Sequence, residues 1–228
     1  MDSLVLSPIA HISSDFPEKF GIPRQSGIVA ELRATVLFTP EFTVDALRGI
    51  EEFSHIWLLW GFSENFDAQW HPTVRPPRLT WERKGIFATR SPLRPNPIGM
   101  SSVRLLEFDD TVPAKPVLQV AGADLLDGTP IYDIKPYVPS DCHSDASRGY
   151  TAINAGRRLE VELPEHLAAQ IAPDKLAALR GILAQDPRPT FHDDATRVYG
   201  VAFAEMNVRF RIAAGVVQVL EIQPRQQF

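Results

Sequence analysis

His55-Ile-Trp-Leu-Leu-Trp-Gly-Phe62 is a run of large apolar residues about as long as one buried strand. Shorter runs rich in β-branched and aromatic residues lie on both sides of it, separated by proline, glycine and polar residues, which is typical of many short strands. The predicted strands cover 4–12, 27–38, 55–62, 85–88, 101–108, 117–121 and 131–136. Seven such strands indicate a mainly β barrel or sandwich.

One helix is expected inside this series, over residues 44–53. Val44, Leu47 and Ile50 recur at a spacing of three, and Thr43 offers a hydroxyl group that can cap the first turn. This helix would be a short insertion between two strands.

The rest of the chain differs in composition. Residues 140–156 are rich in Ser, Asp, Gly and Ala without periodicity and predict a connector. Alanine and leucine at helical spacing predict a helix over 164–185, with Pro173 as the candidate break, and the runs 198–212 and 216–222 predict a β-hairpin. We therefore expect a β domain over 1–145 and a small α+β domain over 146–228.

Composition narrows the class of protein. With 44% hydrophobic and 22% charged residues, the 228-residue chain is an ordinary globular protein, and no apolar run reaches the roughly 18 residues that a membrane span needs. The first residues do not resemble a signal peptide, and the single Cys142 cannot form an internal disulfide. We expect a cytoplasmic protein without a membrane span, and nothing around Cys142 favours a catalytic thiol.

The charge is unevenly distributed. A net charge of -5 argues against a protein that coats nucleic acid, yet residues 70–104 combine one acid with seven basic residues and interleaved aromatics. The basic residues are Arg75, Arg78, Arg83, Lys84, Arg90, Arg94 and Arg104, and the aromatics are Trp70, Trp81 and Phe87. Solvated loop arginines and a nucleic-acid contact both fit this pattern.

Several common cofactor signals are missing. The chain has no glycine-rich turn of the dinucleotide-binding kind, no phosphate-binding Walker loop, no Cys-x-x-Cys and no His-Glu-x-x-His. Its six histidines are scattered. We therefore expect no metal site.

The run Arg90-Ser-Pro-Leu-Arg-Pro-Asn-Pro-Ile-Gly99 stands out. Its three prolines fix the backbone, while two arginines and one asparagine project hydrogen-bonding groups. The planar fork of arginine suits a carboxylate or a phosphate. The run predicts a preorganised loop for a polar ligand, although a rigid structural corner would look the same.

A second run, 124–137, contains a tight turn at Asp127-Gly128 followed by a strand. Strand alternation puts Asp133, Lys135 and Tyr137 on one face, as an active-site row or as a cross-strand ion pair with a neighbour. The loops 14–26 and 64–84 are long and polar, which makes them candidate walls of a site.

The segments 19–25, 53–57, 85–101 and 124–137 together closely resemble the TrmO family of tRNA methyltransferases, in the same order along the chain. The resemblance covers about residues 5–140 and extends to the tail through 184–189 and 207–211. It implies a single closed β-barrel that binds S-adenosylmethionine without a Rossmann sheet, and a homodimer that completes the site. It also implies methyl transfer to N6 of threonylcarbamoyladenosine at position 37 of threonine tRNA.

Carried over position by position, the resemblance assigns the residues beside the cofactor, while strand alternation suggests the proton acceptor and the basic segment suggests the RNA contacts. Those beside the cofactor are Pro23, Arg24, Gln25, Ser63, Glu64, Arg90, Met100, Ser101, Leu126, Asp127, Gly128 and Thr129. Asp133 or Tyr137, tuned by Lys135, would accept the proton that N6 loses. Arg75, Arg78, Arg83, Lys84 and Arg94 would contact tRNA phosphates, with Trp70 or Trp81 stacking on a base.

Two other functions fit parts of the sequence. A non-catalytic β-barrel could bind a nucleotide-like ligand or a protein partner, with Asp133, Lys135 and Tyr137 as structural residues. A hydrolase could use Asp127 and Asp133 as paired carboxylates. In the tail, Arg188, Arg209 and Arg211 suit RNA contacts, but dimerisation or stability would explain the tail equally well.

Overall fold

A computed structural model describes residues 4–76, 82–112, 114–154, 156–189, 192 and 194–225, with Asn154 described by its backbone only. Arg78 and Trp81, which the sequence assigns to RNA contacts, lie outside the described residues.

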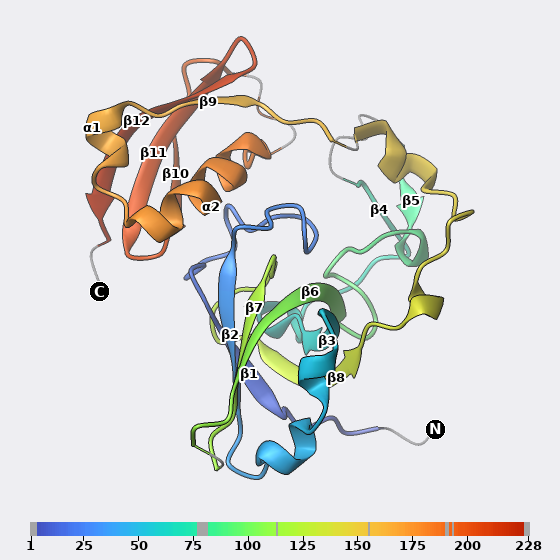
Figure 1. Cartoon of the computed structure of the whole chain (residues 1–228). Helices are drawn as coiled ribbons and strands as arrows, with labels where there is room; N and C mark the ends of the chain where they lie inside the picture. The colour runs from blue at the N-terminus through green and yellow to red at the C-terminus, as the bar shows by residue number, and fades with distance from the viewer. Residues whose placement is uncertain are drawn as a thin grey trace.

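Six antiparallel strands close into a barrel in the N-terminal part of the chain (Figure 1). In barrel order they are β1 (Ala10–Ser14), β2 (Arg33–Phe38), β7 (Val117–Ala121), β6 (Ile98–Asp109), β3 (His55–Gly61) and β8 (Pro130–Pro136). Alternate residues of β3 point inward, since Ile56 and Leu58 are fully buried and Trp60 nearly so. The predicted β-barrel is confirmed.

Most predicted strands are present, but their bounds differ. The prediction 117–121 coincides with β7, and 55–62 exceeds β3 by one residue. The predictions 4–12 and 27–38 start too early, because β1 begins at Ala10 and β2 at Arg33. Residues 27–32 form a loop whose apolar side chains pack elsewhere, and alternation alone could not show where.

Two local predictions are wrong. Residues 85–88 are mostly the 3-10 turn η4 (Ile86–Ala88), and only the two-residue strand β5 (Lys84–Gly85) precedes it, paired with β4 (Thr73–Val74). The helix predicted over 44–53 is two 3-10 turns, η1 (Val44–Leu47) and η2 (Ile50–Glu52), and Thr43 makes no side-chain cap. Gly49, at φ 88°, interrupts them in a conformation that an α-helix excludes.

The C-terminal unit is a four-stranded sheet with two helices. In sheet order the strands are β10 (Tyr199–Phe203), β11 (Met206–Ala213), β12 (Val216–Pro224) and β9 (Glu160–Glu162). The helices α1 (Glu165–Ala168) and α2 (Pro173–Ala184) confirm the predicted break at Pro173. Two features were not predicted: β9 pairs in parallel with β12, and a turn at Ala204 divides the run 198–212 into two strands.

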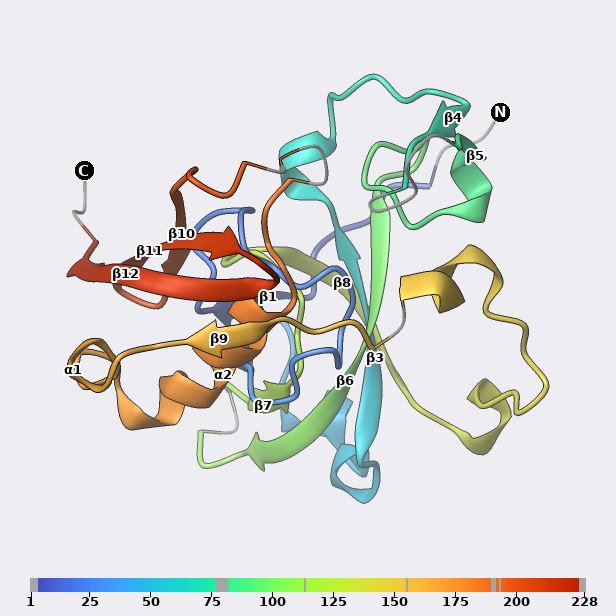
Figure 2. The ribbon, with the colours of Figure 1, turned by 90° about the horizontal axis from the view of Figure 1, so that it is seen from above.

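The connector between the two units contains two 3-10 turns, η5 (Pro139–Asp141) and η6 (Gly149–Asn154). Figure 2 shows it looping away from the barrel before it reaches β9. Its start is fastened to the barrel wall, because the indole nitrogen of Trp57 donates to the Asp141 carboxylate at 2.9 Å. No helix among the described residues is long and apolar enough to cross a membrane.

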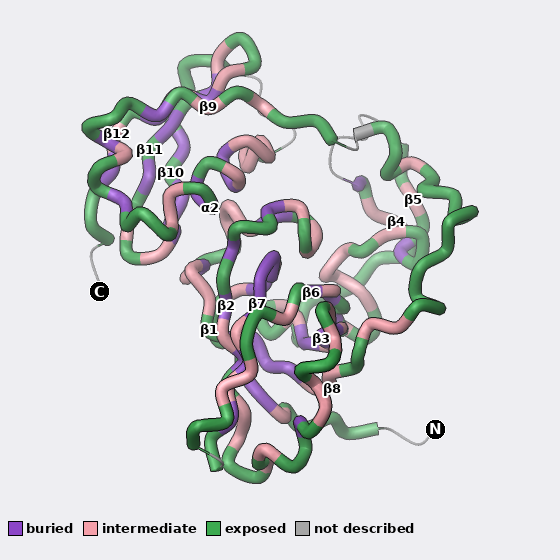
Figure 3. Tube along the Cα trace, viewed as in Figure 1, coloured by how far each residue is buried: buried purple, intermediate pink, exposed green. Residues whose placement is uncertain are grey.

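The buried residues form two separate clusters (Figure 3). One fills the barrel. The other lies between the C-terminal sheet and α2, and it also contains Phe16, Val29 and Leu32 from the loop between β1 and β2. The barrel therefore contributes a loop to the core of the C-terminal unit.

Candidate functional site

Several of the predicted cofactor residues meet near one end of the barrel. The loop 15–32 between β1 and β2 reaches the turn η3 (Ser63–Asn65) after β3, where the Lys19 ammonium lies 3.7 Å from the Glu64 carboxylate and 3.4 Å from the Asn65 side-chain oxygen. The same loop reaches the proline-rich loop, since the Arg90 guanidinium donates to the side-chain oxygen of Gln25. Segments far apart in the sequence thus form one polar surface.

Ser101 is the buried centre of this surface. It lies on β6 with 1% of its surface exposed. Its hydroxyl oxygen accepts a hydrogen bond from the Trp60 indole nitrogen at 3.0 Å, and its hydroxyl group donates to the Asp124 carboxylate at 2.6 Å. The neighbouring Gly99 is required by Trp60, because a Cβ there would lie 2.4 Å from the indole ring.

Asp124 joins this polar surface, although the sequence did not single it out. Burial raises the pKa of its carboxyl group above the ordinary value of an aspartate, and the Ser101 hydrogen bond and the Arg90 charge oppose that shift. A half-buried carboxyl group with a raised pKa, beside a predicted cofactor arginine, is a common feature of functional sites. The only sequence signal was its place directly after a buried strand, at the start of the run 124–137.

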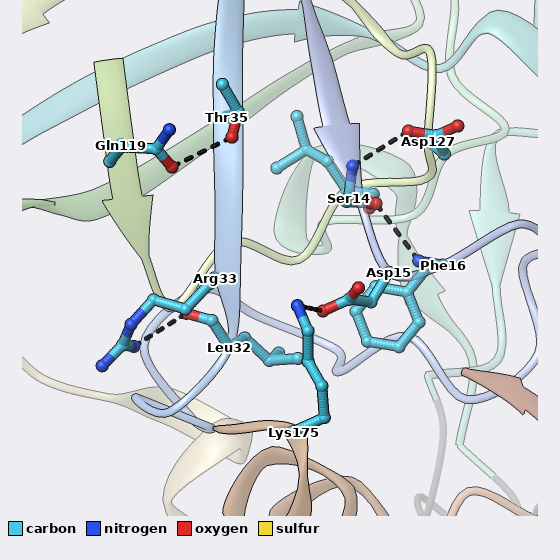
Figure 4. Close-up of polar contacts among 10 residues, drawn as sticks. Ser14, Asp15, Phe16, Leu32, Arg33, Thr35, Gln119, Asp127 and Lys175 are labelled. Atoms are coloured by element: carbon cyan, nitrogen blue, oxygen red, sulfur yellow. Dashed lines mark hydrogen bonds and ion pairs between the residues drawn. The ribbon is translucent and has the colours of Figure 1, made fainter. Parts of the chain in front are cut away.

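The turn 124–129 is fastened to the end of β1 and to the start of the loop 15–32. The Asp127 carboxylate accepts a hydrogen bond from the Ser14 backbone N–H at 2.9 Å (Figure 4), and the Asp127 N–H donates to the Phe16 carbonyl at 2.8 Å. Gly128 adopts φ 75°, which favours glycine, and the buried Thr129 hydroxyl donates to the Leu126 carbonyl at 2.7 Å. The Asp127 carboxylate thus has a structural partner, which counts against its use as a hydrolytic acid or base.

The proline-rich loop is braced by its own arginine. One guanidinium nitrogen of Arg94 donates to the Thr89 carbonyl at 3.0 Å and to the Ser91 carbonyl at 3.4 Å. Arg94 is half-buried. The loop is therefore a rigid corner that also presents Arg90 toward Gln25, and its binding of a ligand stays a prediction.

The predicted row Asp133, Lys135 and Tyr137 lies on the outer wall of the barrel. Asp133 and Lys135 form an ion pair at 2.8 Å within the same strand rather than across strands, and Tyr137 stacks on Trp57 with ring centroids 5.7 Å apart. Among the described residues, no hydrogen bond or ion pair joins this row to Gln25, Arg90 or Ser101.

One link between this row and the cofactor residues runs through the sheet. Leu59 of β3 pairs with Met100 of β6 on one side and with Asp133 of β8 on the other. Partners in register project to the same face of a sheet, so Met100 and Asp133 flank Leu59 on the outer wall. Met100 is 49% exposed there.

The predicted RNA-binding cations are partly used within the protein. The Arg83 guanidinium donates to the Thr73 hydroxyl at 2.8 Å and braces the β4–β5 hairpin, while Lys84 pairs with Glu82 and lies over the Tyr150 ring. Arg75 is exposed. Trp70 and Phe87 also expose large apolar surfaces, at 46% and 80%.

His55 is half-buried at the start of β3. Its ring nitrogen shares a hydrogen bond with the Ser54 hydroxyl at 2.9 Å at the start of β3, beside Tyr137. Within the described part of the chain, no group of three or more His, Cys, Asp or Glu could hold a metal ion.

Two family models match the chain. The tRNA-methyltransferase O N-terminal domain matches residues 11–142, and the TrmO C-terminal domain matches residues 156–225. The chain belongs to the TrmO family. The first match covers the barrel strands, and the second covers the C-terminal sheet and helices.

Individual TrmO relatives match over nearly the whole chain. The tRNA (adenine(37)-N6)-methyltransferase of Escherichia coli K12 is 38% identical over 99% of this chain and 100% of its own length. A putative S-adenosylmethionine-dependent methyltransferase of Pseudomonas aeruginosa is 38% identical over 95% of this chain and 96% of its own. A crystal structure of TrmO from Pseudomonas aeruginosa aligns with a TM-score of 0.78 at 35% identity, covering 98% of both chains.

Proposed function

We propose that this protein is an S-adenosylmethionine-dependent tRNA methyltransferase that methylates N6 of threonylcarbamoyladenosine at position 37 of threonine tRNA. The observation that carries the proposal is the polar surface at the barrel end, where Gln25, Arg90, Ser101 and Asp124 come together from distant segments. Membership of the TrmO family and the name of the Escherichia coli relative support this reaction.

The residues present fit S-adenosylmethionine chemically. Its carboxylate suits the guanidinium of Arg90, and its ammonium and ribose hydroxyls suit carboxylate and backbone acceptors. We assign the cofactor to Pro23, Arg24, Gln25, Arg90, the Met100–Ser101 backbone and the turn residues Leu126, Asp127, Gly128 and Thr129, with Ser63 and Glu64 at the edge. When bound, the cofactor supplies an electrophilic methyl group.

The protein's main contribution would be alignment of the two reactants. Holding the nucleophile and the methyl donor in line converts a bimolecular reaction into an effectively unimolecular one. N6 is acylated and therefore a poor nucleophile, so removal of its proton would help. We assign this role to Asp133 or Tyr137, with Lys135 holding Asp133 through their 2.8 Å ion pair.

The tRNA would lie against the basic segment. Arg75, Arg78, Arg83, Lys84 and Arg94 are the assigned phosphate contacts, and the exposed Trp70 is available for stacking on a base. The outer-wall residues Ile98 and Met100, 41% and 49% exposed, support a homodimer that completes the site. We place the enzyme in the cytoplasm, where tRNA is modified.

Mass spectrometry of threonine tRNA tests the function. The tRNA is incubated with the protein and S-adenosylmethionine, digested to nucleosides and compared with a reaction that lacks the protein. We expect the modified adenosine to gain the mass of one methylene group. Binding of the cofactor without any gain would favour a non-catalytic barrel, and breakdown of a ligand without methyl transfer would favour a hydrolase.

A further inference from the structure

The loop 15–32 lies between the barrel and the C-terminal unit. Phe16, Val29 and Leu32 are at most 3% exposed, and they belong to the core built by α2 and the C-terminal sheet rather than to the barrel core. The half-buried Phe20, Ile22 and Ile28 pack against the same core. The loop's apolar side chains are thus buried by the C-terminal unit.

Two glycines show how closely the loop meets that unit. Gly21 adopts φ 96°, and a Cβ there would lie 2.2 Å from a methyl group of Val201 on β10. Conversely, a Cβ on Gly181 of α2 would lie 2.6 Å from a methyl group of Val29. The backbone of the loop therefore packs on a side chain of β10, and the backbone of α2 packs on a side chain of the loop. Neither the loop nor the C-terminal unit can shift without losing one of these contacts.

Polar contacts hold both ends of the loop. The Lys175 ammonium of α2 lies 2.6 Å from the Asp15 carboxylate (Figure 4), and the side chains are only 26% and 16% exposed. The Ala204 N–H donates to the Asp15 carbonyl at 2.8 Å, and the Arg158 guanidinium donates to the Ile28 carbonyl at 3.0 Å. These contacts lie on either side of residues 23–25.

We propose that the C-terminal unit fixes the cofactor loop and that Lys175 and Val201 are positioning residues for S-adenosylmethionine. The inference rests on the proposed cofactor role of Pro23, Arg24 and Gln25. Gly21 and Ile28, both held by the C-terminal unit, flank those residues, and Gln25 in turn accepts the hydrogen bond from Arg90. Asp15 acts on a second cofactor segment, because the next residue, Phe16, accepts a hydrogen bond from Asp127.

Calorimetric titration of the full chain with S-adenosylmethionine tests this inference. Lys175→Met removes the ammonium and keeps most of the buried stem, and Val201→Ala removes the methyl group beneath Gly21. We expect each change to weaken cofactor binding about 5-fold or more, as is typical of coupling between sites. Exchanging the pair, with Asp15→Lys and Lys175→Asp together, should restore much of the affinity that Lys175→Met loses.

A matched control separates positioning from general destabilisation. Glu221→Gln weakens the 2.8 Å ion pair with Arg209 on the same unit, away from the loop. We expect this variant to bind S-adenosylmethionine like the wild type. Equal loss of affinity in Glu221→Gln and Lys175→Met would overturn the inference, as would normal binding by both Lys175→Met and Val201→Ala.

Hydrogen exchange of residues 15–32, measured without cofactor, distinguishes failure of the positioning role from failure of the proposed function. Lys175→Met should raise exchange in this loop, whereas Glu221→Gln should not. If the wild type binds no S-adenosylmethionine, the proposed function fails. If the wild type binds it, and loop exchange and affinity are both unchanged by Lys175→Met, only the positioning role fails.

Discussion

At the scale of single residues, Asp124 places a half-buried carboxyl group with a raised pKa in the candidate site. Burial dominates its environment, while the Ser101 hydroxyl and the Arg90 charge favour the ionised form. Sequence patterns could not single it out, because an aspartate after a strand is as common in turns as in sites. Its importance follows only from the contact with Ser101, which is distant in the sequence.

The raised pKa of Asp124 has a consequence for stability. A carboxyl group whose folded pKa exceeds its unfolded value binds more protons in the folded state, so this group's contribution to stability declines as pH rises from 3.8 through the raised pKa. In Asp124→Asn this decline should be absent, while the amide oxygen can still accept from Ser101. Denaturant unfolding across that pH window measures it, and an unchanged decline in the variant would rule out Asp124 as its source.

Asp133 gives a prediction about chemistry. If it accepts the N6 proton, Asp133→Asn should lower methylation about 10²- to 10⁴-fold, the usual contribution of a general base. Binding of S-adenosylmethionine should stay normal, because no contact joins Asp133 to Gln25, Arg90 or Ser101 within the described residues. Single-turnover methylation and calorimetry measure the two quantities. Full methylation with normal binding would exclude Asp133 from the role, and Tyr137→Phe would then be the next variant.

At the scale of elements, strands were predictable where one face packs on the barrel core. Residues 117–121 show this, because their buried side chains Leu118 and Val120 pack in the barrel core. The strand prediction was wrong at 27–32, where Val29 and Leu32 pack in the C-terminal core. It was also wrong at 85–88, where the buried Ile86 lies in a 3-10 turn. A hydrophobic pattern indicates which residues are buried, but not which element of the fold buries them.

The proline-rich loop gives a prediction at this scale. Arg94 braces the loop from within, so Arg90 can be changed while the loop stays in place. Arg90→Lys keeps the charge but loses the fork that holds Gln25 and would bind a carboxylate. We expect S-adenosylmethionine to bind about 10- to 100-fold more weakly, which corresponds to about 1.5–3 kcal/mol for one charge-assisted hydrogen bond. Arg83→Lys, on the β4–β5 hairpin, is the control that should keep normal cofactor affinity.

At the scale of the whole molecule, the order of barrel strands followed by helices and a further sheet was predictable, but the shared core was not. The connector and the change in periodicity predicted a β domain followed by an α+β unit. Phe16, Val29 and Leu32 pack against residues beyond 160. The sequence around them gives no sign of these contacts, because such non-local packing depends on the folded topology. The boundary at 145/146 remains a prediction, with the loop 15–32 crossing between the units.

This shared core predicts coupling between the units. Phe16 is 1% exposed and packs on Phe203 with ring centroids 5.7 Å apart, so Phe16→Ala should cost about 3–5 kcal/mol. Because Phe16→Ala removes packing from the C-terminal core, backbone hydrogen exchange should accelerate in β10–β12, although residue 16 lies far from these strands in the sequence. Leu118→Ala, in the barrel core, should leave exchange in those strands slow. Similar exchange in both variants would contradict the coupling.

The place of Phe16, Val29 and Leu32 in the chain also bears on the order of synthesis. The ribosome makes them before α2 and β10–β12, which bury them. The newly made barrel therefore exposes an apolar loop until α2 and β10–β12 have been made, and chaperones bind exposed apolar segments of this kind. If this loop also binds the methyl donor, a chain that lacks α2 and β10–β12 would be both prone to aggregation and inactive.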